Sequence, residues 1–249
     1  MKGFALLLLL ALGGCVTDYA GGLPQPAPKA ERVQAYLDLA RGRLAERNFE
    51  RAADPLERAL ELDPNVVEGH VLMAVLSENR EEPELAEASY ERALRIDRND
   101  SMALNNYGGF LLRQGRQQEA LTYLRRAVED PSYLRRDVAY ENLGVAELAA
   151  GNKGQAKLAF ARALGLDQDL TRANLELAML EFEAGNVPIA NDFYEKFRDG
   201  ARQTPRSLCL GIGIARAMGD RDRLASFTLA LRNLYPRSQE ARTCISDPA

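Results

Sequence analysis

The sequence contains no tryptophan and a single histidine, His70, and its three cysteines form no Cys-x-x-Cys pair. Nucleophilic catalysis by serine or cysteine needs a histidine base held in place by a third group, and zinc centres need clustered cysteine and histidine ligands. His70 falls at a helix-packing position of the repeat described below, so we interpret it as structural. We therefore expect no enzyme, no metal and no cofactor.

The chain also lacks an excess of basic charge. It carries 32 Lys and Arg against 36 Asp and Glu, a net charge of −4, and the two signs are interspersed. Nucleic-acid binding needs basic residues gathered on one face, so this class of partner is excluded. The stretch GNKGQAK, residues 151–157, lacks the preceding strand and the GK[ST] ending of a phosphate loop, and we interpret it as a turn. No small-molecule substrate is predicted.

No apolar run is long enough to span a bilayer. The longest, residues 3–14, falls short of the about 20 residues that a transmembrane helix needs. Lys2 precedes this run, and the end of the run, Leu12-Gly13-Gly14-Cys15, resembles a bacterial lipobox. The pattern predicts a lipoprotein signal peptide over 1–14 and a lipid anchor on Cys15; the alternative is a buried helix with an incidental cysteine. The residue after the cysteine is Val16. An Asp at this position resembles the inner-membrane retention signal of such lipoproteins, so its absence favours the outer membrane.

Residues 15–30 follow the lipobox and hold two adjacent glycines and three prolines, with no apolar periodicity. Such a composition is typical of an extended tether. The tether is predicted to join the lipidated Cys15 to a folded region that covers residues 31–249.

An internal repeat of 34 residues organises the rest of the chain, with starts near residues 33, 67, 101, 137, 171 and 205. The third step, from residue 101 to residue 137, is longer and places two extra residues near EDPSYLRRD, residues 129–137. Alanine recurs at repeat position 20, where two helices must cross closely: Ala52, Ala86, Ala120, Ala156 and Ala190. This pattern predicts an all-α tetratricopeptide-repeat solenoid. About six helical hairpins would form a right-handed superhelix, closed by a C-terminal helix over 238–245 with Ser238 as its N-cap.

The first helix of each hairpin is expected to line a concave groove. Apolar residues predominate at the groove positions, which favours an apolar or amphipathic protein segment as the partner. The alternative is that some of them pack beneath neighbouring helices. The predicted groove residues are Leu37, Leu44, Val71, Val75, Asn105, Leu112, Val145, Leu148, Leu175, Met179 and Phe182.

Cys209 and Cys244 are candidates for a disulfide. Cys209 lies early in the sixth repeat, and Cys244 has nearly the same register if the C-terminal helix continues the stack. A periplasmic lipoprotein would meet the oxidising conditions under which disulfides persist. Two buried free thiols are the alternative.

Four stretches resemble one family: NNYGGFL (105–111), ENLG (141–144), RSLCLGI (206–212) and DRDRLASFTLALRNLYP (220–236). They are similar to the type IV pilus biogenesis and stability lipoproteins, the pilotins of the PilF and PilW family, over residues 31–241. This resemblance implies a non-enzymatic lipoprotein on the periplasmic face of the outer membrane. It also implies that the partner is the pilus secretin, whose localisation and multimerisation the lipoprotein promotes, supporting pilus biogenesis and twitching motility.

A second interpretation of the same sequence is a general periplasmic adaptor. Such a protein would scaffold envelope-assembly or cell-wall enzymes through the same groove. The residues that line the groove do not by themselves separate the two.

Overall fold

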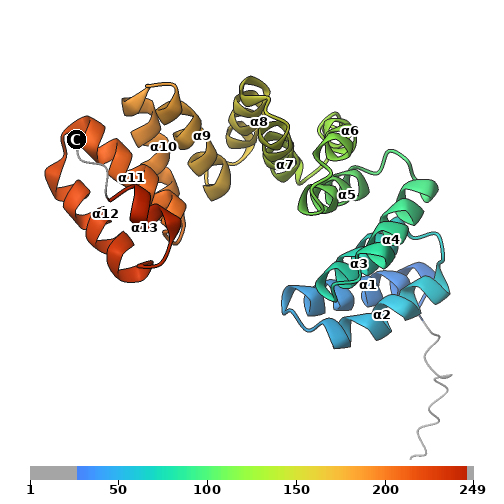
Figure 1. Cartoon of the computed structure of the whole chain (residues 1–249). Coiled ribbons are helices and arrows are strands. Elements are labelled where there is room, and N and C mark those ends of the chain that lie inside the picture. The colour runs from blue at the N-terminus through green and yellow to red at the C-terminus, as the bar shows by residue number, and fades with distance from the viewer. Residues whose placement is uncertain (1–26, 246–249) are drawn as a thin grey trace, which may run out of the picture.

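The computed structural model of the chain describes residues 27–245 and consists of α-helices over that range (Figure 1). The predicted signal peptide and Cys15 lie outside the described residues. No helix between residues 27 and 245 has the length and apolar content needed to cross a bilayer. The helices are α1 (Lys29–Ala45), α2 (Phe49–Leu62), α3 (Val67–Asn79), α4 (Pro83–Ile96), α5 (Ser101–Arg113), α6 (Gln117–Ala127), α7 (Arg136–Ala149), α8 (Lys153–Leu166), α9 (Thr171–Glu183), α10 (Val187–Gly200), α11 (Pro205–Met218), α12 (Arg221–Leu234) and α13 (Gln239–Thr243).

The predicted solenoid of six helical hairpins is confirmed. Helices α3, α5, α9 and α11 begin at the residues expected from the repeat, and α7 begins one residue earlier than expected. Helix α1 begins at Lys29, directly after Pro28, and so takes in the last two residues assigned to the tether. Proline is tolerated at a helix start because the first backbone N–H groups have no partner within the helix.

The turn inside each hairpin requires one residue in the left-handed conformation, always at repeat position 15. Glycine supplies this residue in four repeats, at φ angles from 72° to 82°. Arg47 and Glu81 occupy the same position in the first two repeats, at φ 56° and 61°. Glycine adopts this backbone without steric cost, which explains why it recurs at this point in the sequence.

The two helices of a hairpin cross closely at repeat position 8. A Cβ added at Gly144 would lie 2.6 Å from the ring of Phe160, and one added at Gly108 would lie 2.5 Å from Leu124. Phe160 and Leu124 are fully buried. The small residues therefore let large side chains of the second helix fill the space between the two helices, as the repeat pattern predicts.

Four of the five connections between repeats share a turn built on an aspartate; the exception is the connection between α10 and α11, residues 201–204. Asp63, Asp97, Asp130 and Asp167 each accept a hydrogen bond from the backbone N–H two residues further on, at 2.9–3.1 Å. Most of these connections are short, such as 63–66 and 97–100, whereas the one between α6 and α7 covers 128–135. The extra residues lie where the sequence placed them.

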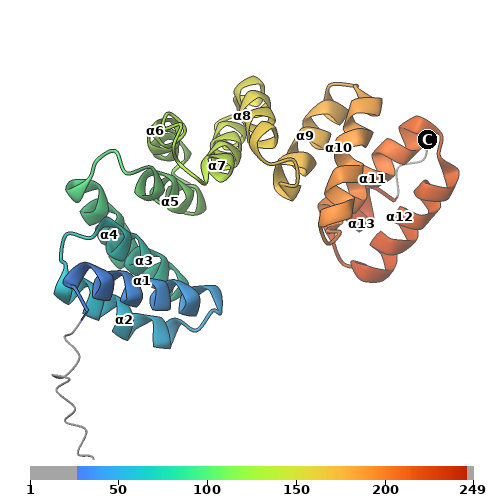
Figure 2. The ribbon, with the colours of Figure 1, turned by 180° about the vertical axis from the view of Figure 1, so that it is seen from behind.

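Consecutive odd-numbered helices approach one another closely along their backbones from α1 to α13. Within residues 27–245 consecutive even-numbered helices do not approach as closely, although α10 and α12 meet through side chains, as in Arg223–Glu195 and Tyr194–Phe227. A stack whose neighbouring helices approach more closely along one side curves toward that side. The repeats accordingly form an arch, with α5, α7 and α9 on its inner side and α6, α8 and α10 on its outer side (Figures 1 and 2).

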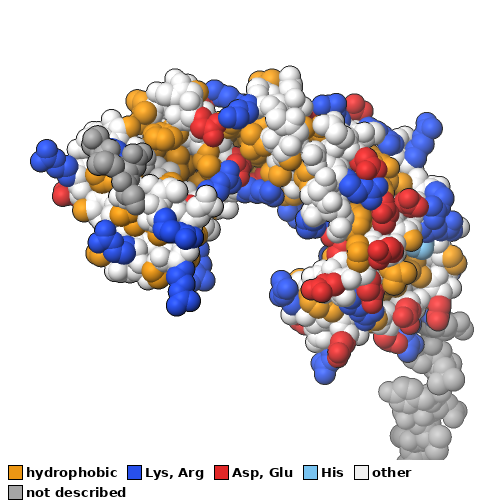
Figure 3. Space-filling view, in the orientation of Figure 1, with side chains coloured by type: hydrophobic (Ala, Val, Ile, Leu, Met, Phe, Trp, Pro, Cys, Tyr) orange, Lys and Arg blue, Asp and Glu red, His pale blue; other side chains and the backbone are white. Residues whose placement is uncertain are grey.

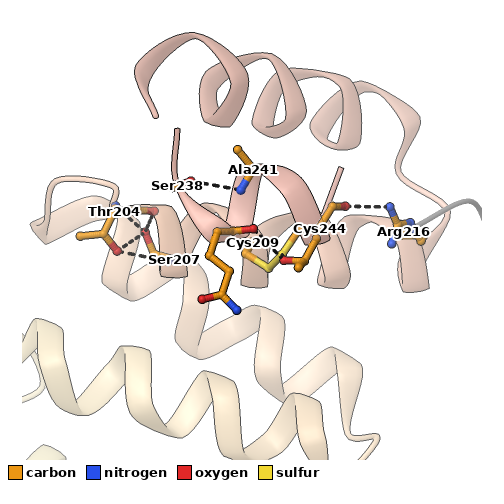
Figure 4. Close-up of a disulfide and its surroundings, with 9 residues drawn as sticks. Thr204, Ser207, Cys209, Arg216, Ser238, Ala241 and Cys244 are labelled. Atoms are coloured by element: carbon orange, nitrogen blue, oxygen red, sulfur yellow. Dashed lines mark hydrogen bonds between the residues drawn. A yellow bond between two sulfur atoms is a disulfide. The ribbon is translucent and has the colours of Figure 1, made fainter. Parts of the chain in front are cut away.

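The C-terminal helix α13 closes the inner stack by packing on α11. Cys209 of α11 and Cys244 at the end of α13 are joined by a disulfide, with their Cα atoms 5.6 Å apart (Figure 4). Ser238 caps α13 by accepting the Ala241 N–H at 3.0 Å, and Arg216 donates to the Cys244 carbonyl at 3.3 Å. The disulfide joins the two cysteines that the helical register predicted to lie together.

Gly144→Ala is expected to lower the free energy of unfolding by about 1–3 kcal/mol, because the new methyl group overlaps the buried Phe160 ring. The matched control is Gly154→Ala at an exposed position of α8, where nothing lies within 4 Å of the added Cβ. That variant should be neutral or more stable, because alanine favours helix. Denaturant melts followed by circular dichroism measure both, and equal stabilities would contradict the close crossing.

Candidate partner-binding groove

The inner face of the arch is held by one direct tie between each pair of adjacent odd-numbered helices. From α1 to α11 the ties are polar: Arg41–Glu68, Glu78–Arg113, Asn142–Asn105, the Ala173 N–H to Glu141, and Arg206–Glu176. The disulfide forms the last tie, between α11 and α13. We call this set the inner ladder. Because each tie joins residues about one repeat apart, the ladder fixes the spacing of the helices that line the groove.

Glu78 is the most connected member of the inner ladder. It accepts the Tyr90 hydroxyl of α4 at 2.6 Å and Arg113 Nε of α5 at 2.9 Å. Burial, with the nearby Glu78 charge, raises the pKa of Tyr90 far above its usual value, so the phenol remains a donor. One carboxylate thereby holds three helices.

Glu141 plays the corresponding part between α7 and α9. Its Oε1 atom accepts the Ala173 backbone N–H at 3.0 Å, at the start of α9. Burial raises the pKa of this carboxyl group, and the bond from Ala173 opposes that rise. The first turn of a helix leaves its backbone N–H groups without partners inside the helix. Glu141 supplies such a partner for the Ala173 N–H.

Two pockets open along the inner face. The larger, of about 680 Å³, lies between α3 and α5, and its lining includes the Glu78–Arg113 pair, buried Phe110, Val75 and Asn106. The smaller, of about 220 Å³, lies between α9 and α11 beside the disulfide. It is lined mainly by apolar side chains: Met179, Phe182, Leu210 and Cys209, with Arg206, Glu183 and Glu240 at its edge.

Seven of the predicted groove residues are half-buried and therefore reachable from solvent: Leu44, Val75, Leu112, Val145, Leu148, Met179 and Phe182. Val75 lines the larger pocket, while Met179 and Phe182 line the smaller one. These residues form the candidate groove, an apolar surface interrupted by the paired charges of the inner ladder.

The other four predicted groove residues are buried, and for these the prediction of an exposed lining is wrong. Leu37 is 1% exposed, Val71 2% and Leu175 9%, and each packs in a core between repeats. Asn105 is 5% exposed because its amide is held between Asn142 and the Tyr133 hydroxyl. The close contact of adjacent odd-numbered helices covers these positions, which a single-helix pattern cannot reveal.

Residues that the sequence did not assign to the groove also shape it. Phe110, Glu78 and Asn79 line the larger pocket, and Leu210 lines the smaller one. The paired Gly108 and Gly109 mark close packing of α5 rather than the larger pocket. A Cβ on Gly108 would meet Leu124 of the hairpin partner, whereas one on Gly109 would lie 3.5 Å from Arg113 and 3.8 Å from Asn142 of α7. Gly109 is buried and is not among the residues that line the larger pocket.

Comparison with known proteins agrees with this architecture. A tetratricopeptide-repeat family model matches residues 37–101 and 78–133. The type IV pilus assembly protein PilF of Pseudomonas aeruginosa is 39% identical over 239 residues, which is 95% of each chain. The solved structure of that PilF superposes with a TM-score of 0.84 over 86% of this chain and 96% of its own. The crystal structure of PilW, a widely conserved type IV pilus biogenesis factor, is 26% identical and superposes with a TM-score of 0.73 over 86% and 98% of the two chains.

Stacked helical hairpins with small residues at their crossings and a lined inner face define a tetratricopeptide-repeat protein. Within that class, the chain belongs to the family of the type IV pilus assembly protein PilF.

Replacing both Cys209 and Cys244 with alanine should lower the stability of the last repeat by about 2–4 kcal/mol, since the disulfide closes a loop with a sequence separation of 35. Denaturant melts with and without a reductant measure this loss. The reduced wild-type chain should match the double variant, while the variant itself should not respond to reductant. A wild-type melt that is also insensitive to reductant would contradict the pairing.

Proposed function

We propose that this chain acts in type IV pilus biogenesis as a non-catalytic outer-membrane lipoprotein that binds the pilus secretin. Membership of the PilF family is the observation that carries this proposal. A lipid on Cys15 would anchor the chain to the periplasmic face of the outer membrane, and the groove would hold a segment of the secretin. Bringing secretin subunits to the membrane in this way promotes their multimerisation and so supports pilus extrusion and twitching motility.

The chemistry of the groove supports a protein segment as the occupant. The half-buried side chains Val75, Leu112 and Leu148 offer apolar contact, while charged groups nearby are already paired, as in Glu78–Arg113. An incoming segment therefore buries apolar surface without leaving these charges unpaired. A segment with one apolar face, such as an amphipathic helix, meets this requirement.

The groove is tested by the double variant Leu44→Ala, Val75→Ala. Removing apolar atoms from both sites should weaken secretin binding about tenfold or more, at roughly 0.8 kcal/mol for each buried methylene group lost. Calorimetric titration with the purified secretin measures the change. Leu37 and Val71 are left intact because they are core residues, and truncating them would lower stability rather than probe contact.

The matched control for the groove is Leu158→Ala on outer helix α8, whose leucine is 61% exposed. Binding by this variant should equal that of the wild type. Unchanged binding by the groove variant would exclude the first two repeats as the site. Recovery of cell-wall hydrolases in place of the secretin would favour the general adaptor instead.

The anchor is tested by Cys15→Ser in cells. The unacylated chain should fold normally but leave the outer membrane, because stable anchoring depends on its acyl chains. Secretin multimers in the outer-membrane fraction should then decrease. Fractionation and immunoblotting measure both proteins, and normal multimers at normal position would count against the role of the lipid.

A further inference from the structure

The last repeat ends in a cluster of arginines that the fold assembles from two separate connections. Residues 201–204 join α10 to α11, and residues 232–238 include the end of α12 and its connection to α13. The Tyr235 hydroxyl donates to the Gln203 carbonyl at 2.8 Å and holds the two segments together. Arg202, Arg232 and Arg237 are exposed on them. We call these two segments the basic tip.

The basic tip carries unbalanced positive charge. Neither of its segments contains an aspartate or a glutamate, and none occurs between residues 200 and 219 or between 223 and 239. None of its three arginines forms a salt bridge with another residue in the range 27–245. Acidic residues predominate instead in the first two repeats, and Figure 3 shows red side chains gathered on that arm facing blue ones at the end of the other.

An apolar side chain accompanies the arginines of the basic tip. Leu234 is 64% exposed, between Arg232 and Arg237. It stands at the last residue of α12 and is followed by Tyr235 and Pro236. A protruding leucine flanked by arginines suits an interface in which an apolar layer lies beneath anionic groups.

The position of the basic tip also matters. Helix α1 begins near the end of one arm of the arch, and the α12–α13 connection forms the end of the other arm (Figure 1). Both ends point to the same side of the arch, as the view from behind also shows (Figure 2). A flat surface below the arch would meet the start of α1 and the basic tip together.

We propose that the basic tip is a docking site for an anionic lipid surface. The arginines would bind lipid phosphate groups, for which the guanidinium fork is suited, and Leu234 would enter the layer beneath them. The inference rests on the proposed function only in that the lipid on Cys15 places the chain next to a membrane. Two attachments, one at each end of the arch, then set its orientation with the mouth of the groove toward the membrane.

The acyl anchor would raise the effective concentration of the basic tip at the membrane surface. Once the acyl anchor is inserted, the basic tip binds as a tethered second site, and modest attraction is enough to keep it on the surface. Each arginine adds to the attraction of an anionic leaflet, and the effect weakens as salt rises. An occupant of the groove would be presented at the membrane surface rather than at the end of a freely turning tether.

The experiment uses residues 15–249 with Cys15→Ser, which contain every described helix and carry neither signal peptide nor acyl chain. Cosedimentation is measured with vesicles of phosphatidylglycerol and phosphatidylcholine and with vesicles of phosphatidylcholine alone. The chain should partition at least about tenfold more strongly to the anionic vesicles, and added salt should reduce the difference. The triple variant Arg202→Glu, Arg232→Glu, Arg237→Glu should lose this preference.

The matched control is Arg51→Glu, Arg80→Glu, Arg162→Glu, which changes net charge equally at exposed sites away from the basic tip. This control should keep most of the preference for anionic vesicles, and circular dichroism should find both variants as helical as the wild type. Equal loss in the control would assign the effect to overall charge and overturn the proposal. No preference in the wild type, or full binding by the tip variant, would also overturn it. None of these outcomes bears on secretin binding or on the Cys15 anchor.

Discussion

The contact between consecutive odd-numbered helices is the constraint on which the rest of this structure depends. Because the odd-numbered helices of neighbouring repeats approach one another more closely than the even-numbered helices do, the stack curves toward them and gains an inner face. The same contact buries Leu37, Val71 and Leu175, which become core residues instead of binding residues. It also brings the polar partners of the inner ladder within hydrogen-bond distance. The curvature, the groove and the pockets therefore all result from the same contact between odd-numbered helices, repeated along the chain.

The inner ladder explains how charged side chains can lie within an apolar groove, because they are paired with one another or with backbone groups. Its carboxylates are held by arginine or by backbone N–H groups, as in Glu176 with Arg206 and Glu141 with Ala173. Paired charges cost less to cover than free ones, so a partner can lie across them. At the C-terminal end the polar tie is replaced by a covalent one, which fixes α13 beside the apolar pocket of Met179 and Phe182.

The basic tip and the proposed anchor together set the orientation of the arch relative to the membrane. The groove alone places no limit on how the molecule stands relative to a membrane. The start of α1 at the end of one arm and the arginines at the end of the other supply two points on the same side. For a protein that is proposed to deliver a partner to a membrane, orientation matters as much as affinity, since it decides where the bound segment lies.

The sequence by itself determined the repeat, most starts of the odd-numbered helices and the small residues at the crossings. These depend on local spacing and on residue size, which a chain displays directly: Gly144 and Gly151 mark a crossing and a left-handed turn whatever lies around them. Helical register was also enough to pair Cys209 with Cys244. Only the tertiary structure decided which groove positions remain reachable, because burial at Val71 or Asn105 depends on the neighbouring repeat. The inner ladder and the basic tip are likewise decided by the fold, since their partners, such as Gln203 and Tyr235, are distant in sequence and meet only when the repeats stack.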